Sequence, residues 1–237
     1  MADSVALSAN EIKFMIKRSV EGLGFSPGDQ LGAGIRVATC YQYGLVDDKT
    51  IHNALDSLLP DVQAPKVIDH GEEWIFDAQG QTSLVQAELA YGAAMSHGVM
   101  SIRLRNTSEG VLVAPMLMTW LSKPMNQPQM RQDLSLYYVH HDGSQRCLAM
   151  TANGSLLGLY EPHRDVVAED EVLLRVDEKA IDGNLLESAS DLIRQREACV
   201  DKGIFLSATL VMRLKDLMMD SFVPESDQSR TSGAGPG

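Results

Sequence analysis

The residues with the clearest potential for chemistry form one polar cluster, RNTSEG, between an alternating strand and an apolar helix. Arg105 and the nearby Arg103 could each bind a carboxylate through paired hydrogen bonds, and Asn106 and Ser108 could add further hydrogen bonds. Glu109 could act as a general acid or base if burial raised its pKa. Ligands of α/β proteins usually bind beyond the carboxyl ends of strands, where this cluster lies. The sequence therefore predicts a small-molecule site at this turn.

The same cluster also has a purely structural interpretation. Asn106, Thr107 or Ser108 could cap the helix that follows, with Glu109 in its first turn. The local pattern alone leaves both interpretations open.

The elements around the cluster are predicted in the order strand, turn, helix, strand, turn, helix. Trp74–Asp77 is a short apolar run, and Thr82 or Ser83 can cap a helix that ends near Gly98. Val99–Arg105 alternates apolar and polar residues, which is typical of a half-buried strand.

Helices are predicted before this segment. Ser8 and Glu11 form a capping box for the first helix, and Pro27 begins the second. Asp48 is expected to cap a third helix over Lys49–Leu59.

The second half of the chain is predicted to begin with a β-meander. Its strands are separated by turn signals and followed by another strand and two helices. The predicted elements are strands Leu134–His140, Gln145–Thr151, Ser155–Tyr160 and Glu171–Val176, and helices Asn184–Lys202 and Ser207–Met219. His140 and His141 are expected to be turn residues, because neighbours on a strand cannot easily share a metal ion.

These elements predict an α/β (α+β) protein with N-terminal helices, a central mixed sheet and a C-terminal β-meander plus two helices. We divide the chain into a helical segment and α/β core at 1–123, a β-meander with C-terminal helices at 124–222, and a flexible tail at 223–237.

The composition excludes several classes of protein. The net charge is −12 and no basic block occurs, which argues against nucleic-acid binding. No apolar run reaches transmembrane length and the N-terminus lacks the shape of a signal peptide, so we expect an acidic, soluble, cytoplasmic protein without a membrane partner. Cys40, Cys147 and Cys199 are too far apart for a disulfide framework or a zinc cluster. The Met-rich last helix favours a homo-oligomer that pairs through its C-terminal helices.

The segment around the polar cluster resembles the malate/L-lactate/ureidoglycolate dehydrogenase family, which is distinct from the Rossmann lactate dehydrogenases. The resemblance lies in the order of a Gly turn, a helix, HGV, an alternating strand, RN-x-S-x-G and an apolar helix. The opening LSANEI is similar to the first helix of that family, and the resemblance covers the N-terminal half of the chain. It implies a dehydrogenase-like fold. Two histidines are functional in the family, and the corresponding positions here are Glu109 and Asp48. We therefore predict these two residues as catalytic.

The chain also departs from the family. Both histidine positions are acidic, and Thr151–Gly154 replaces the Gly-Thr-Asn-Pro turn that binds the nicotinamide cofactor. We therefore predict no cofactor, and a small-molecule enzyme or binding protein that acts on an organic, amino or imino acid. The alternatives are a non-catalytic accessory or oligomeric interaction protein, and an NAD(P)H-dependent reductase of 2-oxo or imino acids. The whole chain further resembles an uncharacterised bacterial family that shares the segment Val223–Gly235.

Overall fold

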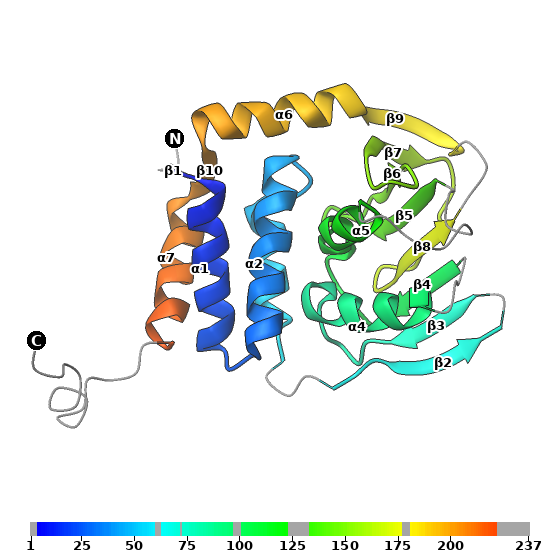
Figure 1. Cartoon of the computed structure of the whole chain (residues 1–237), viewed down its shortest axis with the longest axis horizontal. Helices are drawn as coiled ribbons and strands as arrows, with labels where there is room; N and C mark the ends of the chain where they lie inside the picture. The colour runs from blue at the N-terminus through cyan, green and yellow to red at the C-terminus, as the bar shows by residue number, and fades with distance from the viewer. Residues whose placement is uncertain are drawn as a thin grey trace, which may run out of the picture.

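The computed structural model describes residues 4–59, 63–71, 73–96, 101–122, 133–176 and 181–221. A layer of helices stands beside a large sheet, and a single helix crosses from one to the other (Figure 1). The predicted cap at Gly98, the segment after Lys123 and the tail at 223–237 lie outside the described residues.

The helical layer contains α1 (Ala9–Gly22), α2 (Pro27–Gln42) and α7 (Ala208–Met219), which lie side by side (Figure 1). The capping box at Ser8 is confirmed. The helices α1 and α2 approach closely at Gly34, where a Cβ atom would lie 2.6 Å from the carbonyl oxygen of Lys13. Glycine is therefore required there by packing.

The third helix, α3 (Asp48–Asp56), begins one residue earlier than predicted. Its cap is Asp47, whose Oδ1 accepts hydrogen bonds from Thr50 N and Oγ1, both at 2.9 Å. The prediction that Asp48 caps this helix is wrong, because the Asp48 carboxylate is used in other contacts.

Eight strands form one mixed sheet. In spatial order they are β2 (Lys66–His70), β3 (Trp74–Asp77), β4 (Ser101–Arg105), β8 (Val172–Val176), β5 (Leu134–Val139), β6 (Gln145–Met150), β7 (Leu156–Pro162) and β9 (Gly183–Ser188). β3 and β4 are parallel and are connected through α4 (Ser83–Ser96), whereas the other neighbours are antiparallel. The predicted meander β5–β6–β7 is confirmed, and β8 inserts between it and β4. The predicted α/β fold with a central mixed sheet is therefore confirmed.

The predicted helix Asn184–Lys202 is wrong in its first turn. Residues Gly183–Ser188 form β9, which pairs with β7 at the edge of the sheet, and α6 (Ala189–Lys202) follows. Ser188 begins α6 with a capping box to Asp191. The pairing with β7, which a local pattern cannot reveal, decides the conformation of this segment.

A short two-stranded sheet was not predicted. β1 (Ser4–Leu7) pairs antiparallel with β10 (Ile204–Ser207), immediately before α1 and α7 begin. Ser207 caps α7 as predicted, through its side chain and Leu210 N. This pairing joins the two ends of the described chain.

The main core lies between the sheet and the helices α2, α4 and α5 (Ala114–Leu121). It contains the apolar residues of β4, β5 and β8 that face these helices, such as Leu104, Tyr138 and Leu174. In the described part of the chain, no helix is long and apolar enough to cross a membrane. Cys40 and Cys147 are buried, as expected for inert thiols, and Cys199 is partly buried.

Candidate functional site

The turn that carries Glu109 is held in an unusual backbone conformation. Glu109 and Asn106 have φ angles of 56° and 52°, in the left-handed region. Asparagine tolerates this region, whereas a glutamate in it is uncommon and marks local strain. The alternative interpretation, in which Asn106, Thr107 or Ser108 caps the next helix, is not correct, because a 3₁₀ helix (Gly110–Val113) starts after Glu109 with no side-chain cap.

Neighbouring elements fix this backbone from two sides. Ser83, at the start of α4, donates from Oγ to the carbonyl oxygen of Glu109 at 2.6 Å. The next residue, Gly110, lies so close to the sheet that a Cβ atom there would be 2.4 Å from Val172 Cγ2. The position of Glu109 is thus set by the contact of Gly110 with the sheet.

Glu109 lines a cleft of about 320 Å³. The cleft lies between α3, the Glu109 turn, the hairpin after β5 and the loop before β8. Its lining residues are Asn53, Asp56, Ser57, Ser108, Glu109, Val139, His140, His141 and Glu169.

The pKa of the Glu109 carboxyl group lies above the ordinary value of a glutamate. Burial raises its pKa, and the negative charge of Asp47 adds to this effect. The hydrogen bond from Asn53 and the charge of Lys49 oppose the shift without cancelling it. A carboxyl group with a raised pKa can act as an acid or a base at physiological pH.

His141 is held by two groups at the start of α3. Its Nε2 lies 3.3 Å from Asp47 Oδ2, and its Nδ1 lies 3.4 Å from Thr50 Oγ1. Burial raises the pKa of Asp47, but the hydrogen bonds from Thr50 and the nearby histidines together lower it by more. The pKa of Asp47 therefore lies below the ordinary value. Asp47 is therefore a carboxylate that orients the imidazole of His141, an arrangement found in many acid–base sites.

Two more polar groups complete the cleft. The ring of His140 lies 4.0 Å from that of His141, and its Nδ1 is 3.2 Å from Asp142 Oδ1. Ser108 Oγ is buried and makes no hydrogen bond within the described residues. Such a group is available to a bound ligand.

The arginines predicted to bind a substrate carboxylate are engaged elsewhere. Arg103 donates from Nε to Glu73 and from Nη1 to Glu171, both at 2.7 Å. Arg105 Nε lies 2.8 Å from Glu171 Oε1. Neither arginine lines the cleft that holds Glu109.

Asn106, also predicted to bind substrate, supports the turn instead. Its Nδ2 donates to Asp77 Oδ1 at 2.8 Å, at the end of β3. Of the predicted set, Glu109 and Ser108 alone line the cleft.

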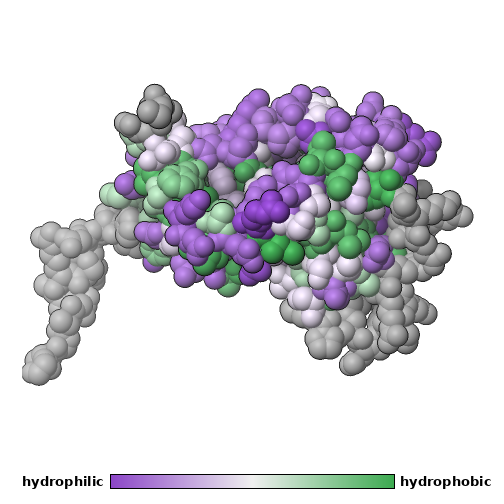
Figure 2. All heavy atoms as spheres, turned by 90° about the horizontal axis from the view of Figure 1, so that it is seen from above, coloured by the Kyte–Doolittle hydropathy of each residue, from purple (hydrophilic) through white to green (hydrophobic). Residues whose placement is uncertain are grey.

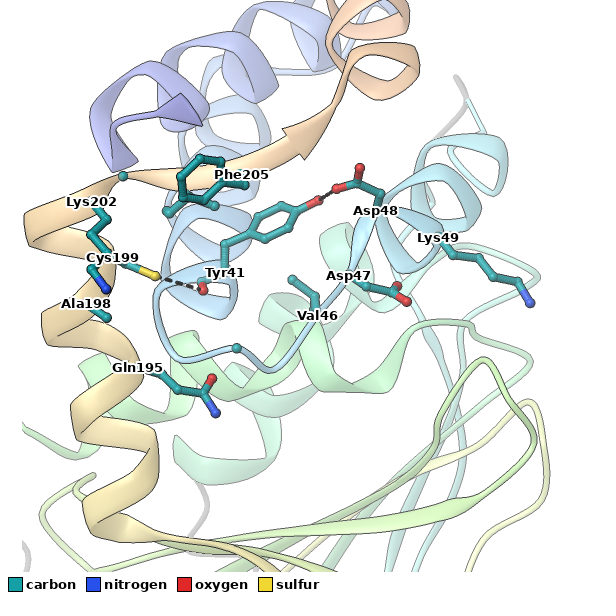
Figure 3. A pocket seen from close by; sticks show the side chains of 13 residues that line it. Tyr41, Val46, Asp47, Asp48, Lys49, Gln195, Ala198, Cys199, Lys202 and Phe205 are labelled. Carbon is teal, nitrogen blue, oxygen red and sulfur yellow. Dashed lines mark hydrogen bonds between the residues drawn. The ribbon is translucent and has the colours of Figure 1, made fainter. Parts of the chain in front are cut away.

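Asp48 faces a second, shallower cavity of about 630 Å³ (Figure 3). Its Oδ1 accepts a hydrogen bond from Tyr41 Oη at 2.8 Å, and its Oδ2 accepts one from Ser207 N at 2.6 Å. Cys199 and Phe205 line the same cavity, and the Cys199 thiol lies 3.8 Å from the Tyr41 carbonyl oxygen. Asp48 and Glu109 thus line different cavities, and Asp47 lines the cavity of Asp48.

We expect Asp48→Ala to destabilise the protein by about 2 kcal/mol, because it removes a charged acceptor for two partly buried donors. Urea unfolding measures this loss, and Asp216→Ala on the exposed side of α7 is the control. Ligand affinity in the Glu109 cleft should not change. A large loss of that affinity, with stability intact, would contradict a structural role for Asp48.

Sequence reasoning missed Asp47, Asn53, His140 and His141 as site residues. The sequence predicts the two histidines as turn residues and not as metal ligands, and their backbone does lie at the turn after β5. No group of three or more His, Cys, Asp or Glu side chains able to hold a metal ion occurs among the described residues. The available signal was a pair of histidines at a hairpin, but their nearness to Glu109 depends on the sheet.

Comparison with known proteins gives a clear result for the fold. No family model and no curated protein matches the sequence. A dehydrogenase from Sinorhizobium meliloti is similar in structure with a TM-score of 0.64 and 11% identity, and the match covers 91% of this chain and 100% of that one.

Two further solved structures agree. Sulfolactate dehydrogenase from Methanocaldococcus jannaschii matches with a TM-score of 0.59 and 9% identity over 92% of this chain and 97% of that one. Malate dehydrogenase from Entamoeba histolytica matches with a TM-score of 0.58 and 7% identity over 94% of this chain and 99% of that one. The similarity therefore extends beyond the N-terminal half, and the chain has the fold of malate/lactate dehydrogenase-like proteins.

Proposed function

We propose that the chain is a small-molecule enzyme that binds an amino or imino acid in the Glu109 cleft and transfers a proton without a nicotinamide cofactor. The observation that carries this proposal is one cleft that contains both a partly buried glutamate with a raised pKa and His140, whose ring lies beside the carboxylate of Asp142. This is the set of groups that general acid–base catalysis requires.

The charges of the cleft favour a substrate with both signs. Glu109 offers a carboxylate to an ammonium or iminium nitrogen, whereas Asp56 is paired with Arg213. His140 can donate a hydrogen bond to a substrate carboxylate, whereas both ring nitrogens of His141 already contact Asp47 and Thr50. A substrate with only negative groups would be repelled by Glu109 and would find no lysine or arginine among the described lining residues. An amino or imino acid is therefore a better fit than a plain organic acid.

The reaction follows from these roles. Glu109, as a carboxylate, accepts the proton from the substrate carbon beside the C=N or carboxyl group. The electron pair left on that carbon delocalises onto the neighbouring group, which accepts a hydrogen bond from His140. Glu109, now protonated, returns a proton to the substrate. This proton transfer requires no oxidant or reductant.

The turn Thr151–Gly154, which stands in place of the Gly-Thr-Asn-Pro turn of the resembled family, is closed by its own hydrogen bonds. The Thr151 hydroxyl, the Asn153 amide and the Ser155 backbone bond to one another, and Gly154 N donates to the Thr151 carbonyl at 2.9 Å. Gly154 has φ 81° and packs so closely on Met118 that a Cβ atom would lie 2.5 Å from its carbonyl oxygen. These residues form a closed hairpin against α5. The absence of the Gly-Thr-Asn-Pro sequence at this turn is the ground for proposing a reaction that does not use the nicotinamide.

The test is a calorimetric and thermal-shift screen against amino, imino, 2-oxo and 2-hydroxy acids, NADH and NADPH. We expect an amino or imino acid to bind and to raise the melting temperature by mass action. Glu109→Gln should weaken this binding, whereas Glu169→Gln, an exposed carboxylate in the same cleft, should change it little. Binding of NADH or NADPH would instead support the reductase alternative, and no binding by any compound would support the non-catalytic interaction protein.

A further inference from the structure

A third cavity, of about 630 Å³, lies beside α6, the helix that crosses from the helical layer to the sheet (Figure 1). Its walls are the end of α2, the helix α5, the turn between β6 and β7, and the middle of α6. The Glu109 cleft adjoins the hairpin before β6, whereas this cavity adjoins the turn after β6, and the two have no described lining residue in common. The third cavity is therefore a separate place for a ligand, and its volume is within the range of small-molecule sites.

The charge of this cavity differs from that of the whole chain. The sequence has 32 acidic and 20 basic residues, yet the described lining of the cavity contains one arginine, Arg196, and no carboxylate. The Glu109 cleft and the Asp48 cavity both contain carboxylates. An anion in the third cavity would therefore be attracted by Arg196 without nearby repulsion.

Arg196 has no acidic partner among the described residues. Its guanidinium lies over the ring of Tyr43, 5.7 Å from the ring centroid. The residues one helical turn away from it, where an ion pair on a helix would form, are uncharged: Leu192, Ile193, Cys199 and Val200. Arg194, by contrast, pairs with Asp191 Oδ1 at 3.0 Å. A planar guanidinium stacked on a ring keeps its N–H edge available, and that edge matches a carboxylate.

The turn between β6 and β7 adds hydrogen-bond donors to the same cavity. Asn153 Oδ1 accepts hydrogen bonds from the Thr151 hydroxyl and, at 3.3 Å, from Ser155 N. The oxygen of this amide is therefore used inside the turn, and its NH₂ group has no partner among the described residues. A Cβ atom at Gly154 would lie 2.5 Å from the carbonyl oxygen of Met118, so the turn is packed tightly against α5. The donor is thus held in place before a ligand binds.

The rest of the lining includes an apolar surface. Met118, Leu156 and Ile193 contribute to it, and Ile193 is 50% exposed. Figure 2 views the molecule from the side on which α6 lies, where apolar groups are exposed among hydrophilic ones. One cation beside an apolar surface fits a molecule with one negative end and an apolar body. Inorganic phosphate carries more charge and no apolar body, so it fits this lining less well.

We propose that this cavity binds an organic carboxylate with an apolar body. Arg196 donates paired hydrogen bonds to the carboxylate, and the Asn153 amide donates another. The apolar body packs on Met118 and Ile193. Because the ligand contacts both α5 and α6, its binding raises the melting temperature. The site is distinct from the proposed catalytic cleft and does not depend on it.

The test is calorimetric titration of the full chain with hexanoate and benzoate, which contain no nitrogen. We expect both to bind, and acetate and inorganic phosphate to bind at least roughly tenfold more weakly because they lack the apolar body. Arg196→Gln should weaken hexanoate binding by about tenfold or more, since it removes a charged donor. Arg194→Gln makes the same change at an arginine that is paired with Asp191, and it should leave the affinity unchanged.

Two further variants test the position of the ligand. Ile193→Asp places a carboxylate one turn from Arg196, at the spacing of Asp191 and Arg194, and should abolish hexanoate binding, whereas Ile193→Asn should weaken it less. Glu109→Gln should leave hexanoate binding unchanged, because Glu109 lines a different cavity. No binding of hexanoate or benzoate, equal affinity for acetate and hexanoate, equal effects of the two arginine variants, or loss of binding in Glu109→Gln would overturn the proposal.

Discussion

Glu109→Gln is expected to slow proton transfer by roughly 10²–10⁴-fold and, at the same time, to stabilise the folded protein at neutral pH. The amide has the shape of the carboxyl group but cannot take a proton from carbon. It also removes a partly buried negative charge, which is unfavourable because partial burial raises the pKa of Glu109. A gain in stability with a loss of activity is characteristic of a functional group in an unfavourable environment.

The gain should depend on pH in a defined direction. The folded-state pKa of Glu109 is raised above its value in the unfolded chain. Protonation therefore favours the folded state, and this stabilisation is present below the unfolded pKa and lost as the pH rises through the folded pKa. The wild-type protein should thus be nearly as stable as the Glu109→Gln variant at about pH 4 and less stable at pH 7.

Urea unfolding at the two pH values measures this difference, and Glu169→Gln provides the matched control with an exposed carboxylate. Equal stability of wild type and Glu109→Gln at pH 7, or an unchanged reaction rate, would remove Glu109 from the proposed role.

Arg103→Ala is expected to destabilise the protein by about 3 kcal/mol. The Arg103 side chain is 14% exposed and contacts Glu73 and Glu171, which are 26% and 13% exposed. Burial raises the pKa of Glu73, but the hydrogen bonds from Arg103 and Ser101 lower it below the ordinary value. Without Arg103, Glu73 loses the arginine that donates a hydrogen bond to it, and Glu171 keeps Arg105.

The comparison with Arg105→Ala makes this prediction specific. Arg105 is 43% exposed and, within the described residues, pairs with Glu171 alone, so its loss should cost less than about 1 kcal/mol. Because Glu73 has a lowered pKa, its contribution to stability is present above the unfolded pKa and is lost as the pH falls through the folded pKa. The destabilisation by Arg103→Ala, measured by urea unfolding, should therefore shrink in acid. Equal losses for both arginines, or loss of ligand binding without loss of stability, would contradict a structural role for Arg103.

Much of the fold could be predicted because its signals are local. Ser8 and Glu11, and Ser207, stand in the sequence next to the helices they cap, and the structure has these caps. The turn at Asn153–Gly154 likewise predicted the β6–β7 hairpin, in which Gly154 has φ 81°. Each of these features depends on residues within a few positions of one another.

The errors occurred where distant segments decide the outcome. Leu185 and Leu186 fit a helical pattern, but pairing with β7 makes them part of an edge strand. Asp47 and Asp48 are equally plausible caps in sequence, and only the contacts of Asp48 with Tyr41 and Ser207 separate them.

The residues of the candidate site could also be predicted only where local sequence decides their position. Glu109 and Ser108 were predicted from their turn and line the cleft, whereas Arg103 and Arg105 were predicted from the same turn and are paired with glutamates. His141 reaches Asp47 only because the hairpin after β5 lies against the start of α3. No local pattern carries this contact between residues far apart in the chain.

The most direct test of the central claim is proton exchange in D₂O, followed by NMR, for the amino or imino acid that binds most tightly, with no nicotinamide present. Catalysed exchange of deuterium into the carbon next to the nitrogen, lost in Glu109→Gln and retained in Glu169→Gln, is the predicted result. Binding without exchange in the wild-type protein would contradict a catalytic role for the Glu109 cleft and leave it a binding site.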